Sequence, residues 1–62
     1  MLYYNLACSE VALGRVDDAL ADLRRAVEMA PPLGEFARAD EDLAAIREEP
    51  GFAEITAAHG AG

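Results

Sequence analysis

The sequence predicts an all-α fold on three observations. Apolar residues recur at three- and four-residue steps along most of the chain, which is the period of an amphipathic helix. Gly14, Pro31 and Pro50 stand between these periodic stretches, where helices stop and start. No stretch alternates β-branched or aromatic residues with polar ones over a useful length. We therefore expect one helical domain over residues 1–62.

Residues 1–31 are expected to form an antiparallel pair of helices. Leu2–Leu13 contains mostly good helix formers and neither proline nor glycine, and Gly14 follows where a helix stop is expected. The second helix runs from Val16 to Ala30, with acidic residues in its first turn, where the helix dipole favours negative charge. Pro31 ends it, because the residue before a proline leaves the α region.

Residues 32–58 are expected to form three short capping helices. Pro32 is suited to the first turn of a helix that continues through Leu33, Phe36 and Ala37. Asp40, Glu41 and Asp42 form an N-cap and acidic first turn for a second helix that reaches about Glu48. Pro50 starts a third helix that ends near Ala58, and residues 59–62 form a frayed tail.

Size and charge exclude several classes of function. A 62-residue chain buries only about 60% of its unfolded surface, so we expect this one to need neighbours for stability. Twelve carboxylates against five arginines give a net charge of −7. Nucleic acid and acidic membrane surfaces both repel such a chain.

The cysteine content and the first residues predict a cytoplasmic protein. Cys8 is the one cysteine of the chain and cannot form an internal disulfide. The first residues lack a basic region followed by an apolar stretch, and no run approaches the length of a membrane span.

The chemistry-bearing residues do not form a catalytic or metal-binding pattern. His59 is the one imidazole and lies near the end of the chain, with no nucleophile nearby to activate. Asp40, Glu41 and Asp42 lack the ligand spacing and central glycine of a calcium loop. The pair Arg24–Arg25 has the charge to bind phosphate, but we expect the helical neighbours Asp22 and Glu28 to neutralise it. We expect no enzyme activity, no metal and no cofactor.

The first half of the chain resembles the tetratricopeptide repeat (TPR) family. The family's signature is, in chain order, an aromatic, a leucine, a small residue, a glycine, an alanine, a bulky apolar residue, an alanine and a proline. The matching residues here are Tyr3, Leu6, Ala7, Gly14, Ala19, Leu23, Ala26 and Pro31. Glu10 departs from the pattern, because a large aromatic usually stands there. The later segment is similar to one that often closes such repeats in bacterial proteins, and it agrees at Asp40, Asp42, Leu43, Arg47, Pro50 and Phe52.

The resemblance implies a non-catalytic protein–protein interaction module, a scaffold or adaptor that binds a protein or peptide. In this family the first helix of a repeat lines a peptide groove, and the matching residues here, the groove stripe, are Tyr4, Cys8, Val11 and Ala12. The alternative is that the short helix around Phe36 covers this stripe.

A second apolar face of the first helix contains Leu2, Leu6 and Leu13, the leucine face, with Ser9 on the same side. A preceding repeat normally docks here, so the chain is expected either to end a longer repeat array or to self-associate as a two-fold dimer. The remaining alternative is a purely architectural cap of a larger protein, with no external ligand.

Overall fold

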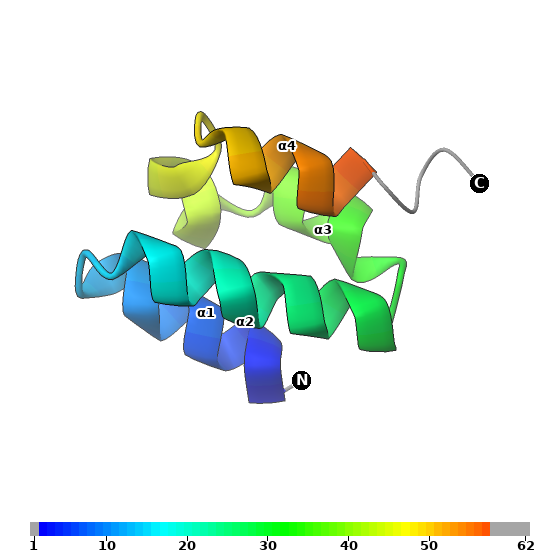
Figure 1. Cartoon of the computed structure of the whole chain (residues 1–62), viewed down its shortest axis with the longest axis horizontal. Coiled ribbons are helices and arrows are strands. Elements are labelled where there is room, and N and C mark those ends of the chain that lie inside the picture. The colour runs from blue at the N-terminus through cyan, green and yellow to red at the C-terminus, as the bar shows by residue number, and fades with distance from the viewer. Residues whose placement is uncertain (1, 58–62) are drawn as a thin grey trace.

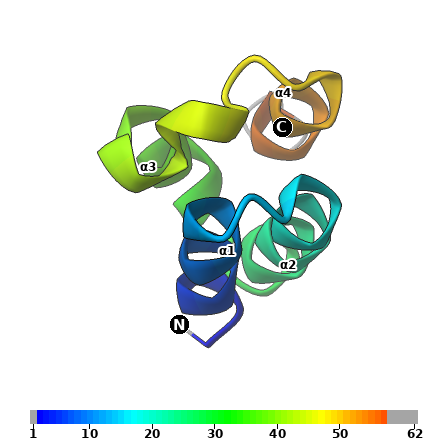
Figure 2. The ribbon, with the colours of Figure 1, turned by 90° about the vertical axis from the view of Figure 1, so that its left-hand side faces the viewer.

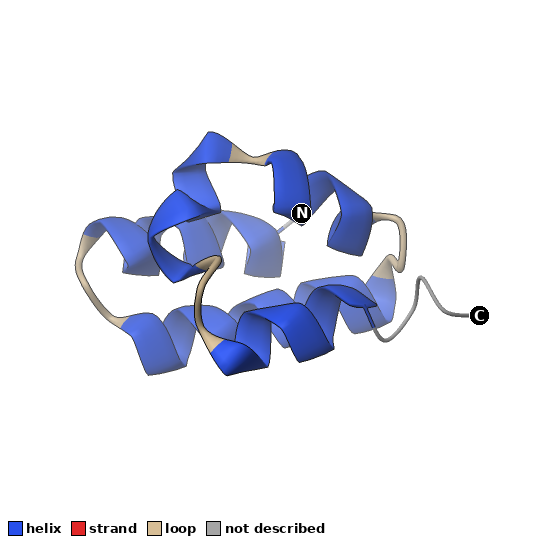
Figure 3. Ribbon diagram, turned by 90° about the horizontal axis from the view of Figure 1, so that it is seen from above, coloured by secondary structure: helices blue, strands red, loops and turns tan. Residues whose placement is uncertain are grey.

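The computed structural model describes residues 2–57, which form two layers of helices (Figure 1). One layer contains α1 (Leu2–Ala12) and α2 (Val16–Met29). The other contains α3 (Leu33–Ala39), the 3₁₀ helix η1 (Glu41–Ile46) and α4 (Pro50–Ala57). Short loops join all five, as Figure 3 shows.

Helices α1 and α2 run in opposite directions and pack along their length (Figure 1). Gly14 makes the turn between them possible, because its φ of 78° lies in the left-handed region that residues with a Cβ rarely adopt. Buried alanines on the two helices, Ala7, Ala19 and Ala26, allow close approach. Helix α2 stops where Ala30 takes an extended conformation before Pro31.

The second layer covers one side of this pair (Figure 2). Helix η1 packs on α1, while α4 packs on α2 and on α3. Asp40 caps η1 by accepting a hydrogen bond from the backbone N–H of Asp42 at 2.9 Å. Gly34 in α3 lies so close to α4 that a Cβ at this position would come within 3.1 Å of the Thr56 carbonyl oxygen.

The core lies between the two layers. Its largest fully buried side chains come from both, namely Leu23, Val27, Leu43 and Ile46. Thr56 is buried among apolar residues, and its hydroxyl donates a hydrogen bond to the Phe52 carbonyl at 3.0 Å. The opposite side of α1, away from the second layer, has no cover from the described part of the chain.

The predicted all-α class is confirmed over residues 2–57, which contain no strand. The predicted N-cap at Asp40 and the stop at Gly14 are confirmed as well. The helix expected after Asp40 is a 3₁₀ helix that ends at Ile46, two residues before the predicted end near Glu48. The predicted tail of residues 59–62 and the end of the last helix at Ala58 lie outside the described residues. No helix among residues 2–57 has the length and apolarity to cross a membrane.

Candidate functional site

The leucine face lies on the open side of α1. Leu2 is 69% exposed, Leu6 41% and Leu13 71%, and Ser9 between them is exposed too. Leu13 follows the last residue of α1, yet its N–H still donates to the Ser9 carbonyl at 3.1 Å, so its side chain continues the helical face. An uncovered row of leucines in so small a domain is a typical protein-docking surface.

The groove stripe is divided between core and surface, and at its first residue the alternative applies, in which the helix around Phe36 covers the stripe. Tyr4 is 3% exposed, Cys8 and Val11 are half-buried and Ala12 is exposed. The ring of Phe36 packs edge-on against Tyr4 with 5.7 Å between ring centroids. The physical reason is that α3 and η1 fold back over this side of α1, as the alternative prediction held for the helix around Phe36.

A buried tyrosine and a carboxylate connect α1 to the second layer. The hydroxyl of Tyr4 donates a hydrogen bond to Asp40 Oδ2 at 2.5 Å, across 36 residues of sequence. Burial, followed by this bond and the Asp40 charge, raises the pKa of Tyr4 well above its ordinary value. The same bond, with that from the Asp42 N–H, lowers the pKa of Asp40. The pair holds η1 on α1.

Cys8 lies beside the same carboxylates. Its Sγ and one oxygen each of Asp40 and Asp42 lie within 4.8 Å of one another, a grouping that the sequence did not predict. Such a set resembles metal ligands, but both oxygens of Asp40 already accept hydrogen bonds, from Tyr4 and from the Asp42 N–H. Burial and the two carboxylates raise the pKa of Cys8, which disfavours the thiolate that a metal or an electrophile needs.

Charges of opposite sign lie at the two ends of the surface between α1 and α2. Near the turn, Glu10 of α1 faces Asp22 and Asp18 of α2, and Asp18 is paired with Arg15 at 2.8 Å. The Oε1 atom of Glu10 is buried and accepts no hydrogen bond. Two carboxyl groups can share a hydrogen bond only when one of them is protonated. This contact with Asp22, followed by burial, raises the pKa of Glu10.

At the other end of this surface the charge is positive, because Arg25 forms no ion pair within residues 2–57, in contrast to the neutralisation expected from its helical neighbours. The guanidinium of Arg25 lies 5.6 Å from the centre of the Tyr3 ring, a cation–π contact. Met29, one turn further along α2, is 75% exposed. Arg24 is exposed as well and, one position earlier on α2, points toward a different side of the helix.

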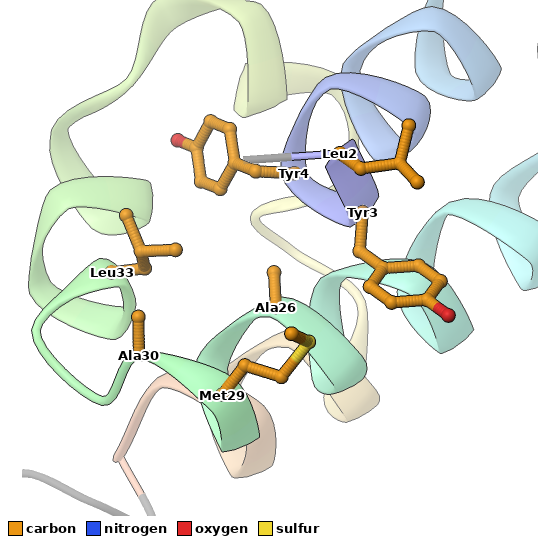
Figure 4. Close-up of a pocket in the computed structure, with 7 residues that line it drawn as sticks. All are labelled: Leu2, Tyr3, Tyr4, Ala26, Met29, Ala30 and Leu33. Atoms are coloured by element: carbon orange, nitrogen blue, oxygen red, sulfur yellow. The ribbon is translucent and has the colours of Figure 1, made fainter.

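An apolar hollow of about 420 Å³ opens where α1 begins and α2 ends (Figure 4). Seven residues line it, Leu2, Tyr3, Tyr4, Ala26, Met29, Ala30 and Leu33. Leu2 and Tyr4 point in opposite directions from the first turn of α1, so Leu2 belongs to the outer face and Tyr4 to the inner one. The titratable groups that line the hollow are the phenols of Tyr3 and Tyr4, and His59 lies outside the described residues.

No protein-family model, no curated protein and no solved structure matches this chain. The resemblance to tetratricopeptide repeats therefore stays a prediction from the sequence.

Proposed function

We propose that this chain is a non-catalytic protein-interaction module that docks another helix on the leucine face of α1. The observation that carries the proposal is the one-sided cover of α1. Its inner side is buried under α2, α3 and η1, while Leu2, Leu6 and Leu13 on its outer side stay exposed. A helix that is apolar on both sides is typical of one packed between two neighbours.

The energetics favour a docked state. The exposed area of the three leucines adds up to nearly that of two fully exposed leucines. Burying one fully exposed leucine side chain contributes about 1.5–3 kcal/mol. That gain matters for a chain of 62 residues, because a single core of this size rarely supplies more than about 3–5 kcal/mol. A partner that buries the leucine face stabilises the folded state by mass action.

We also propose a scaffold or adaptor role in the cytoplasm, as the tail of a tetratricopeptide-like array or as a self-associating unit. The sequence resemblance and the single cysteine support these assignments. The raised pKa of Cys8 supports a non-catalytic thiol.

Site-specific photo-crosslinking in the cells that make the protein tests the docking surface. A photoreactive residue at Leu6 is expected to give a defined adduct, and one at the exposed Ala53 of α4 is not. Mass spectrometry then identifies the adduct. Equal labelling at both positions, or none at either, contradicts the proposed function and favours the purely architectural cap.

A further inference from the structure

We propose that the helix docked on the leucine face is α1 of a second copy of the chain, antiparallel to the first about a two-fold axis. This inference rests on the proposed function, because it names the partner of the same surface. Three features of the chain carry it: the spacing of the leucine face, the absence of charge on that face, and the reversal of charge along its flank.

The spacing of the face suits antiparallel self-pairing. Leu2, Leu6, Ser9 and Leu13 follow steps of four, three and four residues, the pattern of a helix–helix seam. This pattern reads the same from both ends, with its midpoint between Leu6 and Ser9. A two-fold axis at the midpoint places Leu2 opposite the partner's Leu13 and Leu6 opposite the partner's Ser9, so leucine meets leucine at both ends of the seam and leucine meets serine in the middle.

The leucine face is also free of charge. Each copy has a net charge of −7, so most pairs of surfaces on two copies bring carboxylates together. In α1 the single charged residue is Glu10, and it faces Asp22 of its own chain. Two copies can therefore meet along α1 without burying an unpaired charge, which is the arrangement with the lowest desolvation cost.

The flank beside the leucine face adds charge complementarity. Its acidic end contains Glu10 and Asp22, since Asp18 is already paired with Arg15, and its basic end contains Arg25 on the Tyr3 ring. Reversing one copy about the two-fold axis brings the basic end of each beside the acidic end of the other. In a parallel pair the two flanks would lie on opposite sides of the seam and would not meet, so only the antiparallel arrangement gains this complementarity.

The expected dimer is weak. Helix α1 has 11 residues and is about 16 Å long, so the contact is smaller than the roughly 800 Å² per partner of a stable interface. The dimer is therefore expected at high micromolar concentrations of protein. Salt is expected to strengthen it, because screening reduces the repulsion between two chains of like net charge.

Sedimentation equilibrium of the full chain between about 10 μM and 1 mM tests the second copy. The mass is expected to rise from monomer to dimer. Leu6→Glu is expected to weaken the dimer at least tenfold, and Ala53→Glu, which adds the same charge on exposed α4, is expected to leave it within twofold. Circular dichroism of each variant establishes that it is folded. A monomer across the whole range, or equal loss with both variants, overturns the proposal.

Disulfide trapping in a Cys8→Ala background tests the register. A mixture of Leu2→Cys and Leu13→Cys chains is expected to give mainly the mixed dimer, whereas a parallel pair gives each variant bound to itself. Arg25→Glu is expected to weaken the dimer several-fold more than Arg24→Glu, its matched neighbour on α2. Dimers of like variants, or equal effects of the two arginine changes, overturn the antiparallel arrangement.

The outcome of photo-crosslinking separates this inference from the proposed function. An adduct at Leu6 with a second copy of α1 agrees with both. An adduct with a different protein, together with a monomer in sedimentation, refutes the second copy and leaves the docking surface in place.

Discussion

The hydrogen bond from Tyr4 to Asp40 gives a sharp test of how the second layer is held. Tyr4→Phe removes one hydroxyl and leaves the ring and its contact with Phe36 in place. Hydrogen bonds to charged groups contribute about 1.5–3 kcal/mol, and half-exposure of Asp40 reduces this, so the free energy of unfolding is expected to fall by about 1–2 kcal/mol. For a domain of this size the melting temperature falls by about 5–15 °C.

The pH dependence of this loss follows from the two pKa shifts. Asp40 has a lowered pKa, so its stabilising effect is complete above its ordinary pKa near 4 and is lost as the pH falls through the lowered value. Tyr4 has a raised pKa, so its effect is complete below about pH 10 and is lost as the pH rises above that. The difference between the wild type and Tyr4→Phe is therefore widest between these limits and narrows at both ends.

Thermal unfolding followed by circular dichroism from pH 2 to pH 11 measures this difference. Tyr3→Phe is the matched control, because the Tyr3 hydroxyl makes no hydrogen bond within residues 2–57. Asp40→Asn completes a double-mutant cycle, since asparagine keeps the N-cap of η1 but not the charge. A melting temperature of Tyr4→Phe equal to that of Tyr3→Phe at neutral pH, or additive effects in the cycle, would show that the Tyr4–Asp40 hydrogen bond does not stabilise the fold.

Three further outcomes are expected. Gly51→Ala is expected to raise the unfolding free energy by about 0.5–1 kcal/mol, because the added Cβ would lie at an ordinary 3.5 Å from a leucine methyl. Gly34→Ala is expected to lower the unfolding free energy, because its Cβ would approach a backbone oxygen at 3.1 Å. Changes of the same sign for the two variants in denaturant melts contradict this. Glu10→Gln is expected to raise the melting temperature at pH 7 but not below about pH 4. The pKa of Glu10 is raised beside Asp22, so its ionised form destabilises the fold as the pH rises. A rise in melting temperature that is independent of pH argues against this. Cys8 is expected to react with a thiol reagent at neutral pH several-fold more slowly than in the denatured chain, and equal rates contradict its raised pKa.

Local physical rules were sufficient to predict the helices. Gly14 turns the chain because its φ is positive, and Asp40 caps η1 because its short side chain reaches the Asp42 N–H. Both effects act within a few residues and can therefore be read from the sequence. The α or 3₁₀ character of η1 was not predictable, because packing on α1 decides how tightly so short a helix winds.

The candidate site was predictable only in part. The leucine face follows from helical periodicity, and the exposure of its leucines agrees with that expectation. The groove stripe has the same periodicity, and nothing in the spacing of Tyr4 and Cys8 indicates that the second layer folds over them. The contacts of Glu10 with Asp22 and of Arg25 with Tyr3 depend on the register between α1 and α2, which the sequence alone does not specify.

The all-α class, the places where helices start and stop, and the two apolar sides of α1 follow from local patterns, because each depends on residues within a turn or two of one another. Which of those two sides is buried depends on the packing of the whole chain. Tyr4 meets Asp40 across 36 residues, and that long-range contact holds the second layer over the groove stripe and leaves the leucine face open. Contacts between distant segments depend on how whole helices pack, and no local pattern encodes that choice.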